Sequence, residues 1–239
     1  ERGSGSSPLW DFILTCDCEC INSRFWPQEA VIMDFSKVPL QTVERLSRYR
    51  RVLADLQEDG VESVFSHRLA ELMGVTPAQV RRDLSIFGSF GNVARGYDVV
   101  ELHGTIGRLL GTDKLQTLAM IGLGNLGRTL LTYRGFQERG FHIGPVFDRD
   151  SEKIGKVYAG RRCYSIDDLE TVLPDFKCKM AILACGSSGL DAIVARLADL
   201  GIRSILNFVP CRVTPPQGVF IENVDLSAKL EKLSFLSKA

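Results

Sequence analysis

A glycine-rich turn near the middle of the chain constrains its fold more than any other feature. The apolar segment Leu115 to Ile121 predicts a short buried strand, and a turn with the spacing G-x-G-x-x-G follows it and opens a helical segment, Arg128 to Tyr133. A turn of this kind between a strand and a helix is typical of dinucleotide-binding α/β domains. The residues of the turn, which we expect to bind a cofactor, are Gly122, Leu123, Gly124, Asn125, Leu126 and Gly127.

An acidic residue follows at the distance that such a domain requires. A second apolar segment, Phe141 to Phe147, ends at Asp148, about 20 residues beyond Gly127. The Asp148 carboxylate would accept both hydroxyls of an adenosine ribose and repel a 2′-phosphate, so we expect NAD to be preferred over NADP. Arg149 is the next residue of the expected site, and its charge weakens that preference. A glycine turn that serves packing only is the alternative interpretation.

The alternation of strand and helix continues along the chain. Lys179 to Ala184 predicts a strand, Leu190 to Leu200 a helix and Ile202 to Phe208 another strand, which indicates a parallel sheet. Cys185 and Gly186 follow the carboxyl end of a strand, where ligands of open α/β sheets bind, so we include both in the cofactor site. A flexible turn is the alternative role for that loop.

The first part of the chain has the periodicity of a small helical domain. Apolar residues recur every three or four positions from Thr42 to Glu58, which predicts one helix with a buried face. Ser66 is expected to cap a second helix with Leu72 pointing inward, and Thr76 with Pro77 to open a third. The spacing of the last two helices predicts a helix-turn-helix.

Polar side chains of the third helix are expected to face DNA. Ala78, Val80 and Leu84 would pack inward, and the glycine-containing loop from Ser89 to Tyr97 is suited to a wing. The candidate DNA-contacting residues are Gln79, Arg81, Arg82 and Ser85 of this helix, together with Arg45 and Arg48 of the first helix and Arg95 of the loop.

The net charge of the chain gives DNA binding no support. The 29 basic and 29 acidic residues cancel, and nine basic residues face seven acidic ones between Lys37 and Arg95. The placement is more informative, because the acidic residues gather between Asp55 and Glu62 whereas Arg81 and Arg82 lie on the predicted recognition helix. A helical dimerisation or substrate domain with a solvated basic face is the alternative.

The first 32 residues differ in character from the rest of the chain. They have neither strand nor helix periodicity, and codons for Gln28 to Ala30 can contain a ribosome-binding string just before Met33. We therefore expect residues 1–32 to be a disordered leader that is non-native or mis-annotated. Cys16, Cys18 and Cys20 lie there without a CxxC or histidine partner nearby, so no metal site is expected.

No apolar run approaches the roughly 20 residues of a membrane span, and we expect a cytoplasmic protein. The last segment, Asp225 to Lys238, predicts a helix with one apolar stripe, which would cover either its own domain or a partner subunit. The stripe consists of Leu226, Leu230, Leu233 and Leu236.

From about Lys37 to the end, these motifs together resemble the Rex family of redox-sensing repressors. The segments that carry the resemblance are Arg45-Leu46 with Tyr49, Gln79 to Ser85 with Phe87-Gly88, the glycine turn through Tyr133, Leu206 to Phe208 with Pro210, and Glu222 to Asp225. The resemblance implies a homodimer with a winged-helix domain (33–110), an NAD(H)-binding Rossmann domain (111–224) and a C-terminal dimerisation helix (225–239) swapped onto the partner. It also implies that operator DNA is bound when NADH is scarce and released when NADH binds.

The resemblance assigns further roles by position. Tyr133 would lie beside the nicotinamide, Asn207 and Phe208 would belong to the cofactor site, and Arg51 could pair with Asp225 as a switch contact.

Two departures from the family pattern affect these roles. The segment Gly91 to Tyr97 lacks the usual GKRGxGY form, so minor-groove contact would depend on Arg95 from a shifted position. Cys185-Gly186 replaces a common valine-proline pair, which would alter the nicotinamide site.

Two other functional classes share parts of this pattern. An NAD-dependent oxidoreductase would need a substrate domain and a catalytic acid, but only about 29 residues follow the Rossmann unit, and the three histidines lie away from the expected nicotinamide loop. A nucleotide- or CoA-binding regulatory subunit would leave the helix-turn-helix without a role. We therefore expect a regulator with no catalytic residues.

Overall fold

The computed structural model describes residues 38–88, 90–91 and 95–238. The expected leader, its three cysteines and part of the expected wing lie outside the described residues.

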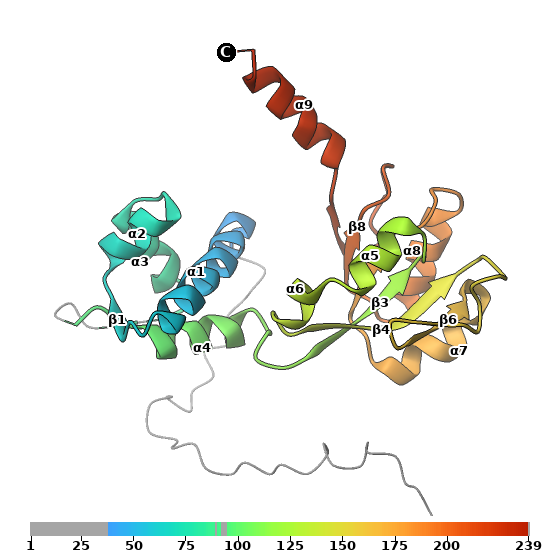
Figure 1. Cartoon of the computed structure of the whole chain (residues 1–239), viewed down its shortest axis with the longest axis horizontal. Helices are drawn as coiled ribbons and strands as arrows, with labels where there is room; N and C mark the ends of the chain where they lie inside the picture. The colour runs from blue at the N-terminus through green and yellow to red at the C-terminus, as the bar shows by residue number, and fades with distance from the viewer. Residues whose placement is uncertain (1–37, 89, 92–94, 239) are drawn as a thin grey trace, which may run out of the picture. The chain divides into compact units, whose positions relative to one another are not determined.

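Four helices and two short strands form the N-terminal part of the described chain (Figure 1). The elements are α1 (Leu40–Glu58), β1 (Ser63–Val64), α2 (Ser66–Met73), α3 (Pro77–Ser85), β2 (Tyr97–Asp98) and α4 (Val99–Leu109). The strands β1 and β2 pair antiparallel. Thr76 caps α3 as expected, because its hydroxyl accepts the N–H of Gln79 at 3.2 Å, and Pro77 occupies the first turn. The arrangement is a winged helix-turn-helix.

In the core of this part, two of the four inward positions predicted for α2 and α3 are confirmed, and three details differ from the prediction. Val80 and Leu84 are buried, whereas Leu72 is 42% exposed and Ala78 is exposed, so both inward predictions were wrong. Leu69 and Met73 fill the inward side of α2 instead. Ser66 is the first helical residue, and Phe65 is the N-cap.

A seven-stranded sheet forms the second part of the described chain. Its order is β5-β6-β4-β3-β7-β8-β9, with β5 antiparallel and the other neighbours parallel. The strands are β3 (Gln116–Ile121), β4 (Phe141–Asp148), β5 (Val157–Tyr158), β6 (Arg161–Ser165), β7 (Met180–Leu183), β8 (Ser204–Asn207) and β9 (Phe220–Asn223). From β3 the chain runs outwards through β4 to the β5–β6 edge, and it then returns to the other side of β3 for β7. This change in strand order is that of a Rossmann fold, and it opens a crevice between β3 and β7. The sequence did not predict β5, β6 or β9.

Helices cover both faces of this sheet (Figure 1). They are α5 (Asn125–Leu131), α6 (Arg134–Gln137), α7 (Leu169–Val172) and α8 (Leu190–Asp199). Successive residues of β3 point to opposite faces. Ala119 and Ile121 join the hydrophobic cluster that contains α8, whereas Leu118 and Met120 join a second cluster. Two buried faces explain why the strands are continuously apolar rather than alternating.

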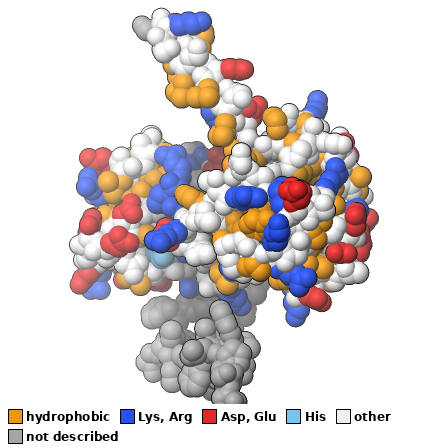
Figure 2. Space-filling view, turned by 45° about the vertical axis from the view of Figure 1, so that its right-hand side comes forward, with side chains coloured by type: hydrophobic (Ala, Val, Ile, Leu, Met, Phe, Trp, Pro, Cys, Tyr) orange, Lys and Arg blue, Asp and Glu red, His pale blue; other side chains and the backbone are white. Residues whose placement is uncertain are grey.

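The last helix, α9 (Leu226–Leu236), buries none of its residues. It begins at Asp225, whose carboxylate accepts the N–H of Ala228 at 3.0 Å. Leu226, Leu230 and Leu233 are 62%, 66% and 60% exposed. The predicted apolar stripe is therefore present and uncovered in a single chain (Figure 2, hydrophobic side chains in orange). Among the described residues, no helix has the length and apolar character needed to cross a membrane.

Candidate functional site

A cleft of about 470 Å³ lies at the carboxyl ends of β3, β4 and β7. It brings together three regions that were predicted from the sequence to form the cofactor site: the glycine turn, the acidic residue and the loop after β7. The polar and glycine residues that line it are Gly122, Gly124, Asp148, Arg149, Lys153, Cys185 and Gly186. Parallel strands place their carboxyl ends at one edge of the sheet, so the switch in strand order makes this edge the ligand-binding edge.

The three glycines of the turn have different surroundings. A Cβ at Gly122 would lie 2.6 Å from the backbone of Ala184, and a Cβ at Gly127 would overlap the carbonyl oxygen of Gly122. At Gly124 a Cβ would meet no described atom within 4 Å. Gly122 and Gly127 therefore let strands and helix pack closely, whereas Gly124 faces open space at the start of α5, where a phosphate group fits.

The Asp148 carboxylate is held in place by three donors. Its Oδ2 accepts the N–H of Leu123 at 2.6 Å and lies 3.3 Å from Lys153 Nζ, and its Oδ1 accepts the N–H of Asp150 at 2.9 Å. Burial raises the pKa of Asp148, but these donors outweigh burial and the pKa is lowered. The group is thus a fixed anion at the edge of the cleft. Sequence reasoning missed Lys153, although its position three residues after Asp150 was a local signal.

Several expected cofactor residues do not line this cleft. The Leu123 side chain is fully buried, so only its backbone takes part in the site. Asn207 is also buried, and its amide donates to Asn223 Oδ1 at 2.8 Å while its Oδ1 accepts the N–H of Val209. Phe208 is half-buried against the second cluster. Asn207 therefore joins the ends of β8 and β9.

Tyr133 is an exposed aromatic residue between α5 and α6. Its ring is 58% exposed and meets Phe136 edge to face at 5.1 Å between centroids. A Cβ at Gly135 would lie 2.6 Å from Tyr133 Cζ, so the ring occupies the space that the missing side chain leaves. Asn125 and Leu126 are exposed in the first turn of α5.

Two of the candidate DNA-contacting residues are engaged inside the N-terminal part. Asp83 is 1% exposed and accepts two hydrogen bonds from Arg45, at 2.6 and 2.7 Å, and one from Gln79 at 2.8 Å. Tyr49 donates to the same carboxylate at 2.9 Å. Arg45 and Tyr49 of α1 therefore hold α3 through Asp83, and Gln79, one turn earlier on α3, orients that carboxylate. Sequence reasoning missed Asp83 as their partner, since only the spacing of Gln79 and Asp83, one helical turn apart, indicated the contact.

The other candidate DNA-contacting residues lie on the surface. Arg82 is exposed, and its guanidinium makes no hydrogen bond or ion pair within the described part of the chain. Arg81 donates to Ser66 Oγ at 3.0 Å, and Ser85 donates to the carbonyl of Arg82 at 2.9 Å. Arg48 donates to the carbonyl of Met73 at 3.1 Å. Arg95 is exposed next to residues 92–94, which the structure does not describe.

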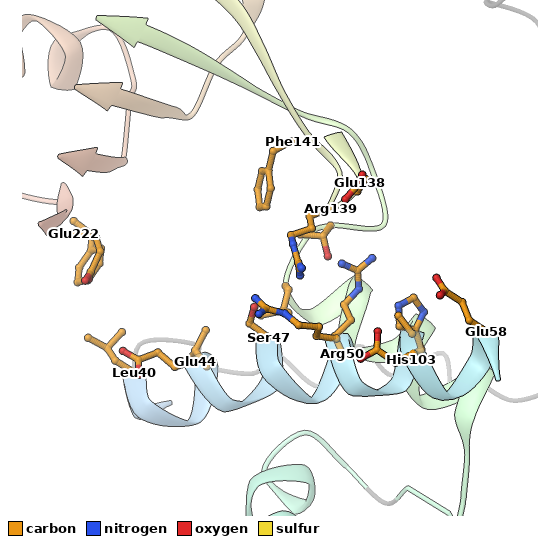
Figure 3. Close-up of a pocket in the computed structure, with 17 residues that line it drawn as sticks. Leu40, Glu44, Ser47, Arg50, Glu58, His103, Glu138, Arg139, Phe141 and Glu222 are labelled. Carbon is orange, nitrogen blue, oxygen red and sulfur yellow. The ribbon is translucent and has the colours of Figure 1, made fainter. Parts of the chain in front are cut away.

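The opposite face of α1 carries further basic side chains, and Figure 3 shows Arg50 there with His103 of α4. The Nε of Arg50 is buried without a hydrogen-bond partner among the described residues, and a Cβ at Gly107 would lie 3.3 Å from it. Burial and the charge of Arg50 lower the pKa of His103. Arg51 is exposed on the same helix, and no ion pair joins it to Asp225 within the described residues of one chain.

Metal ligands are not clustered in the part of the chain that the structure describes: no group of three or more histidine, cysteine or acidic residues could hold an ion there. The C-x-C-x-C run lies outside that part.

Two family models match the chain. The model described as "Putative DNA-binding protein N-terminus" covers residues 37–85, and the model described as "CoA binding domain" covers residues 113–211. The first spans α1 to α3, and the second spans β3 to the end of β8.

Curated relatives and solved structures match both parts together. The redox-sensing transcriptional repressor Rex of Desulfitobacterium hafniense is 41% identical over 199 residues, which are 83% of this chain and 95% of that protein. A crystal structure of RSP in complex with beta-NAD+ and operator DNA has a TM-score of 0.79 at 34% identity, over 83% of this chain and 91% of that chain. RSP in complex with beta-NADH has a TM-score of 0.75 at 33% identity, over 83% and 93% of the two chains.

Proposed function

This chain belongs to the Rex family of redox-sensing transcriptional repressors, and we propose that it binds operator DNA through its winged helix and releases it when NADH occupies the cleft at the carboxyl ends of β3, β4 and β7. The observation that carries the proposal is the presence, in one chain, of a dinucleotide cleft with a fixed Asp148 anion and a helix-turn-helix with exposed Arg81 and Arg82. An enzyme would not need the helix-turn-helix, and a simple DNA-binding protein would not need the dinucleotide cleft.

The residues of the cleft fit NAD(H) in chemistry and space. The open surroundings of Gly124 leave room for a pyrophosphate at the start of α5, and Asp148 Oδ1, which accepts only the N–H of Asp150, has an acceptor position left for a ribose hydroxyl. Cys185 and Gly186 border the same cleft, and Tyr133 supplies an exposed aromatic face for the nicotinamide. NADH differs from NAD⁺ in carrying an uncharged, reduced nicotinamide ring, which is the redox signal.

On the DNA side, α3 supplies the contacts. Arg82, which is free of internal partners within the described residues, reads the major groove, while Arg81 and Ser85 contact the backbone or neighbouring bases. Arg45 of α1 holds α3 through Asp83, and Gln79 of α3 orients the Asp83 carboxylate. Arg48 and Arg95 add phosphate contacts from either side of the recognition helix.

The active form is a homodimer, and α9 is its exchanged element. Three leucines that are at least 60% exposed need an apolar surface, and a second copy supplies one. An isologous pair also matches the two half-sites of an operator. In this dimer, Asp225 of one copy pairs with Arg51 of the other in one of the two domain arrangements.

The protein is a cytoplasmic regulator that catalyses no reaction. The dimer has two arrangements, one that binds DNA and one that holds the recognition helices away from it. NADH favours the second, and the size of the response depends on how much more tightly NADH binds that arrangement than the first.

Operator mobility-shift assays with NADH and NAD⁺ titrated separately test this function. NADH should release the DNA at concentrations at which NAD⁺ does not. If a genuine operator is not bound specifically in either state, the repressor function is excluded. If the operator is bound but neither nucleotide changes the binding, the sensor function is excluded.

A further inference from the structure

Cys185 and Cys211 follow the ends of neighbouring strands, and we propose that peroxide joins them in a disulfide that makes the repressor less sensitive to NADH. The bond forms within one chain, beside the cleft at the carboxyl ends of β3, β4 and β7. The site of the bond is independent of the proposed function, whereas its effect on DNA release rests on that function.

The sheet brings the two cysteines to the same edge. β7 and β8 are neighbouring parallel strands, and their register pairs Leu183 with Asn207. Cys185 is two residues beyond Leu183, and Cys211 is four residues beyond Asn207. Both therefore follow the carboxyl ends of their strands, at the edge of the sheet where the cleft lies.

The two side chains also lie on the same face of the sheet. Cys185 and Cys211 both pack against the hydrophobic cluster that contains α8. The N–H of Phe208 donates to the carbonyl of Leu183 at 2.9 Å, so the pairing of the strands continues past their ends and brings Val209 beside Cys185. The N–H of Cys211 then donates to the carbonyl of Val209 at 2.7 Å, which turns the chain and keeps Cys211 near this position.

The spacing of neighbouring strands suits a disulfide. Strands in a sheet are about 4.8 Å apart, and the Cα atoms of a disulfide are usually about 4.4–6.8 Å apart. Burial raises the pKa of the Cys185 thiol, and the charge of Cys211 raises it further, so the two sulfurs are close enough to interact. Gly186 follows Cys185, and a Cβ there would meet no described atom within 4 Å, so the loop has room to let the sulfurs meet.

These two thiols are also the most accessible of the cysteines that the structure describes. Both are half-buried, whereas Cys163 and Cys178 are 0% and 4% exposed. Cys185 lines the cleft, so a small oxidant reaches its sulfur from solvent. The charge of Arg149 partly opposes the effect of burial on the pKa of Cys185 and favours the reactive thiolate.

The reaction is a two-electron oxidation of the thiols by hydrogen peroxide. The Cys185 thiolate attacks one peroxide oxygen, the O–O bond breaks, and the leaving hydroxide takes up a proton to become water. The Cys211 thiolate then attacks the sulfur of the resulting sulfenic acid, the S–O bond breaks, and a second hydroxide leaves and is protonated. The two protons come from the two thiols, so two thiols and one peroxide give one disulfide and two water molecules.

The disulfide changes the cofactor site and not the winged helix. Cys185 leaves its present position in the lining of the cleft, because its sulfur is drawn towards the loop after β8 and the two loops are tied together. The buried residues of α3 belong to a different hydrophobic cluster, which contains neither cysteine. The oxidised protein therefore still binds operator DNA but responds less to NADH.

Peptide mapping tests the site of the bond. The full-length protein is treated with hydrogen peroxide, its remaining thiols are blocked, and it is digested with trypsin. Trypsin releases residues 180–196 and 204–212 as separate peptides, which contain one cysteine each, Cys185 and Cys211. We expect the two peptides to be joined, and a reductant should separate them. Cys163→Ala removes a buried cysteine of the second cluster and should leave the cross-link in place.

Titration with NADH tests the effect of the bond. The oxidised wild type should bind NADH at least about tenfold more weakly than the reduced protein, and it should stay on the operator at NADH concentrations that release the reduced protein. Reduction should restore the response. Cys211→Ser should lack the cross-link and keep its NADH response after the same treatment, and Cys185→Ser should also lack the cross-link.

Absence of the joined peptides from the oxidised wild type overturns the inference, as does a cross-linked protein whose NADH affinity is unchanged. An equal loss of NADH response in oxidised Cys211→Ser would assign the effect to another cysteine and also contradicts the inference. Failure of the reduced protein to bind NADH contradicts the proposed function instead, and the peptide map still decides whether the bond forms.

Discussion

Arg45 and Asp83 join α1 to α3 through two parallel hydrogen bonds, Nε to Oδ2 at 2.6 Å and Nη2 to Oδ1 at 2.7 Å. The two residues are 38 positions apart, and the carboxylate is almost completely buried. Tyr49 and Gln79 donate to the same carboxylate, so it is paired and saturated with donors. The angle of the recognition helix therefore depends on one buried anion.

Replacement of this anion should destabilise the N-terminal part. Asp83→Ala leaves the Arg45 guanidinium and the Tyr49 hydroxyl without their acceptor, and we expect a loss of about 3 kcal/mol in the free energy of unfolding. Urea denaturation followed by circular dichroism measures it. Glu71→Ala, which breaks the exposed pair with Arg68, is the control and should cost less than about 1 kcal/mol. Equal losses in both variants would contradict the role of Asp83.

The same carboxylate predicts a dependence of stability on pH. Burial raises the pKa of Asp83, but bonds from Arg45, Gln79 and Tyr49 outweigh burial and the folded-state pKa is lowered. A lowered folded-state pKa contributes stability above the unfolded-state value, near 3.8, and this contribution declines as the pH falls towards the folded-state value. The difference in unfolding free energy between the wild type and Asp83→Asn should therefore shrink between pH 5 and about pH 3. A constant difference over that range would be the contrary result.

Arg82→Ala should reduce operator affinity by about 10- to 100-fold and leave NADH affinity unchanged. The reason is that Arg82 is exposed on α3, without an internal partner in the described chain, so its removal should affect the proposed DNA contact and not the fold. Fluorescence anisotropy with labelled operator measures the first effect, and nicotinamide fluorescence measures the second. Loss of both activities would point to misfolding.

Asp148→Asn should lower NADH affinity by about tenfold, because a neutral amide replaces a charged acceptor of the ribose hydroxyls. The amide oxygen can still accept the N–H of Leu123, but the amide nitrogen would then face the N–H of Asp150, so this variant also loses one contact of the loop after β4. Calorimetric titration measures the loss of NADH affinity, and the melting temperature measures the loss of stability separately. An NADH affinity equal to that of the wild type would exclude the ribose role.

Gly135→Ala should disturb the Tyr133 ring without touching the winged helix. The new methyl group would lie 2.6 Å from Tyr133 Cζ, so the ring must leave its present position. Loss of one aromatic contact of about 1 kcal/mol corresponds to about fivefold weaker NADH binding. Operator binding without NADH should not change. Tyr133→Phe keeps the ring and is the matched control, and it should affect NADH affinity less than Gly135→Ala does.

Features encoded within a short stretch were predictable from the sequence. The strand, the glycine turn, the helix and Asp148 all lie within about 35 residues, and each follows a local rule of turn geometry or periodicity. The cap at Thr76 and the stripe on α9 are likewise local patterns. These features were predicted with nearly correct bounds.

Features that depend on distant partners were missed. Asp83 was counted only among the seven acidic residues between Lys37 and Arg95, because its buried environment comes from Arg45 and Tyr49 of another helix. The strand β9 is four residues long with mostly exposed side chains, and its pairing with β8 is what makes it a strand. Leu72 and Ala78 were predicted to be buried from helical phase, but the inward positions of α2 and α3 are filled by their neighbours.

If α9 is the exchanged element of the proposed homodimer, its exposed leucines make protein abundance a second input to repression. The helix then gains its packing only from association, so the fraction of the protein that is dimeric and able to bind DNA depends on the number of copies per cell. A cell with few copies would then repress weakly even when NADH is scarce. The amount of repressor would set the NADH level below which the genes controlled by the operator are repressed.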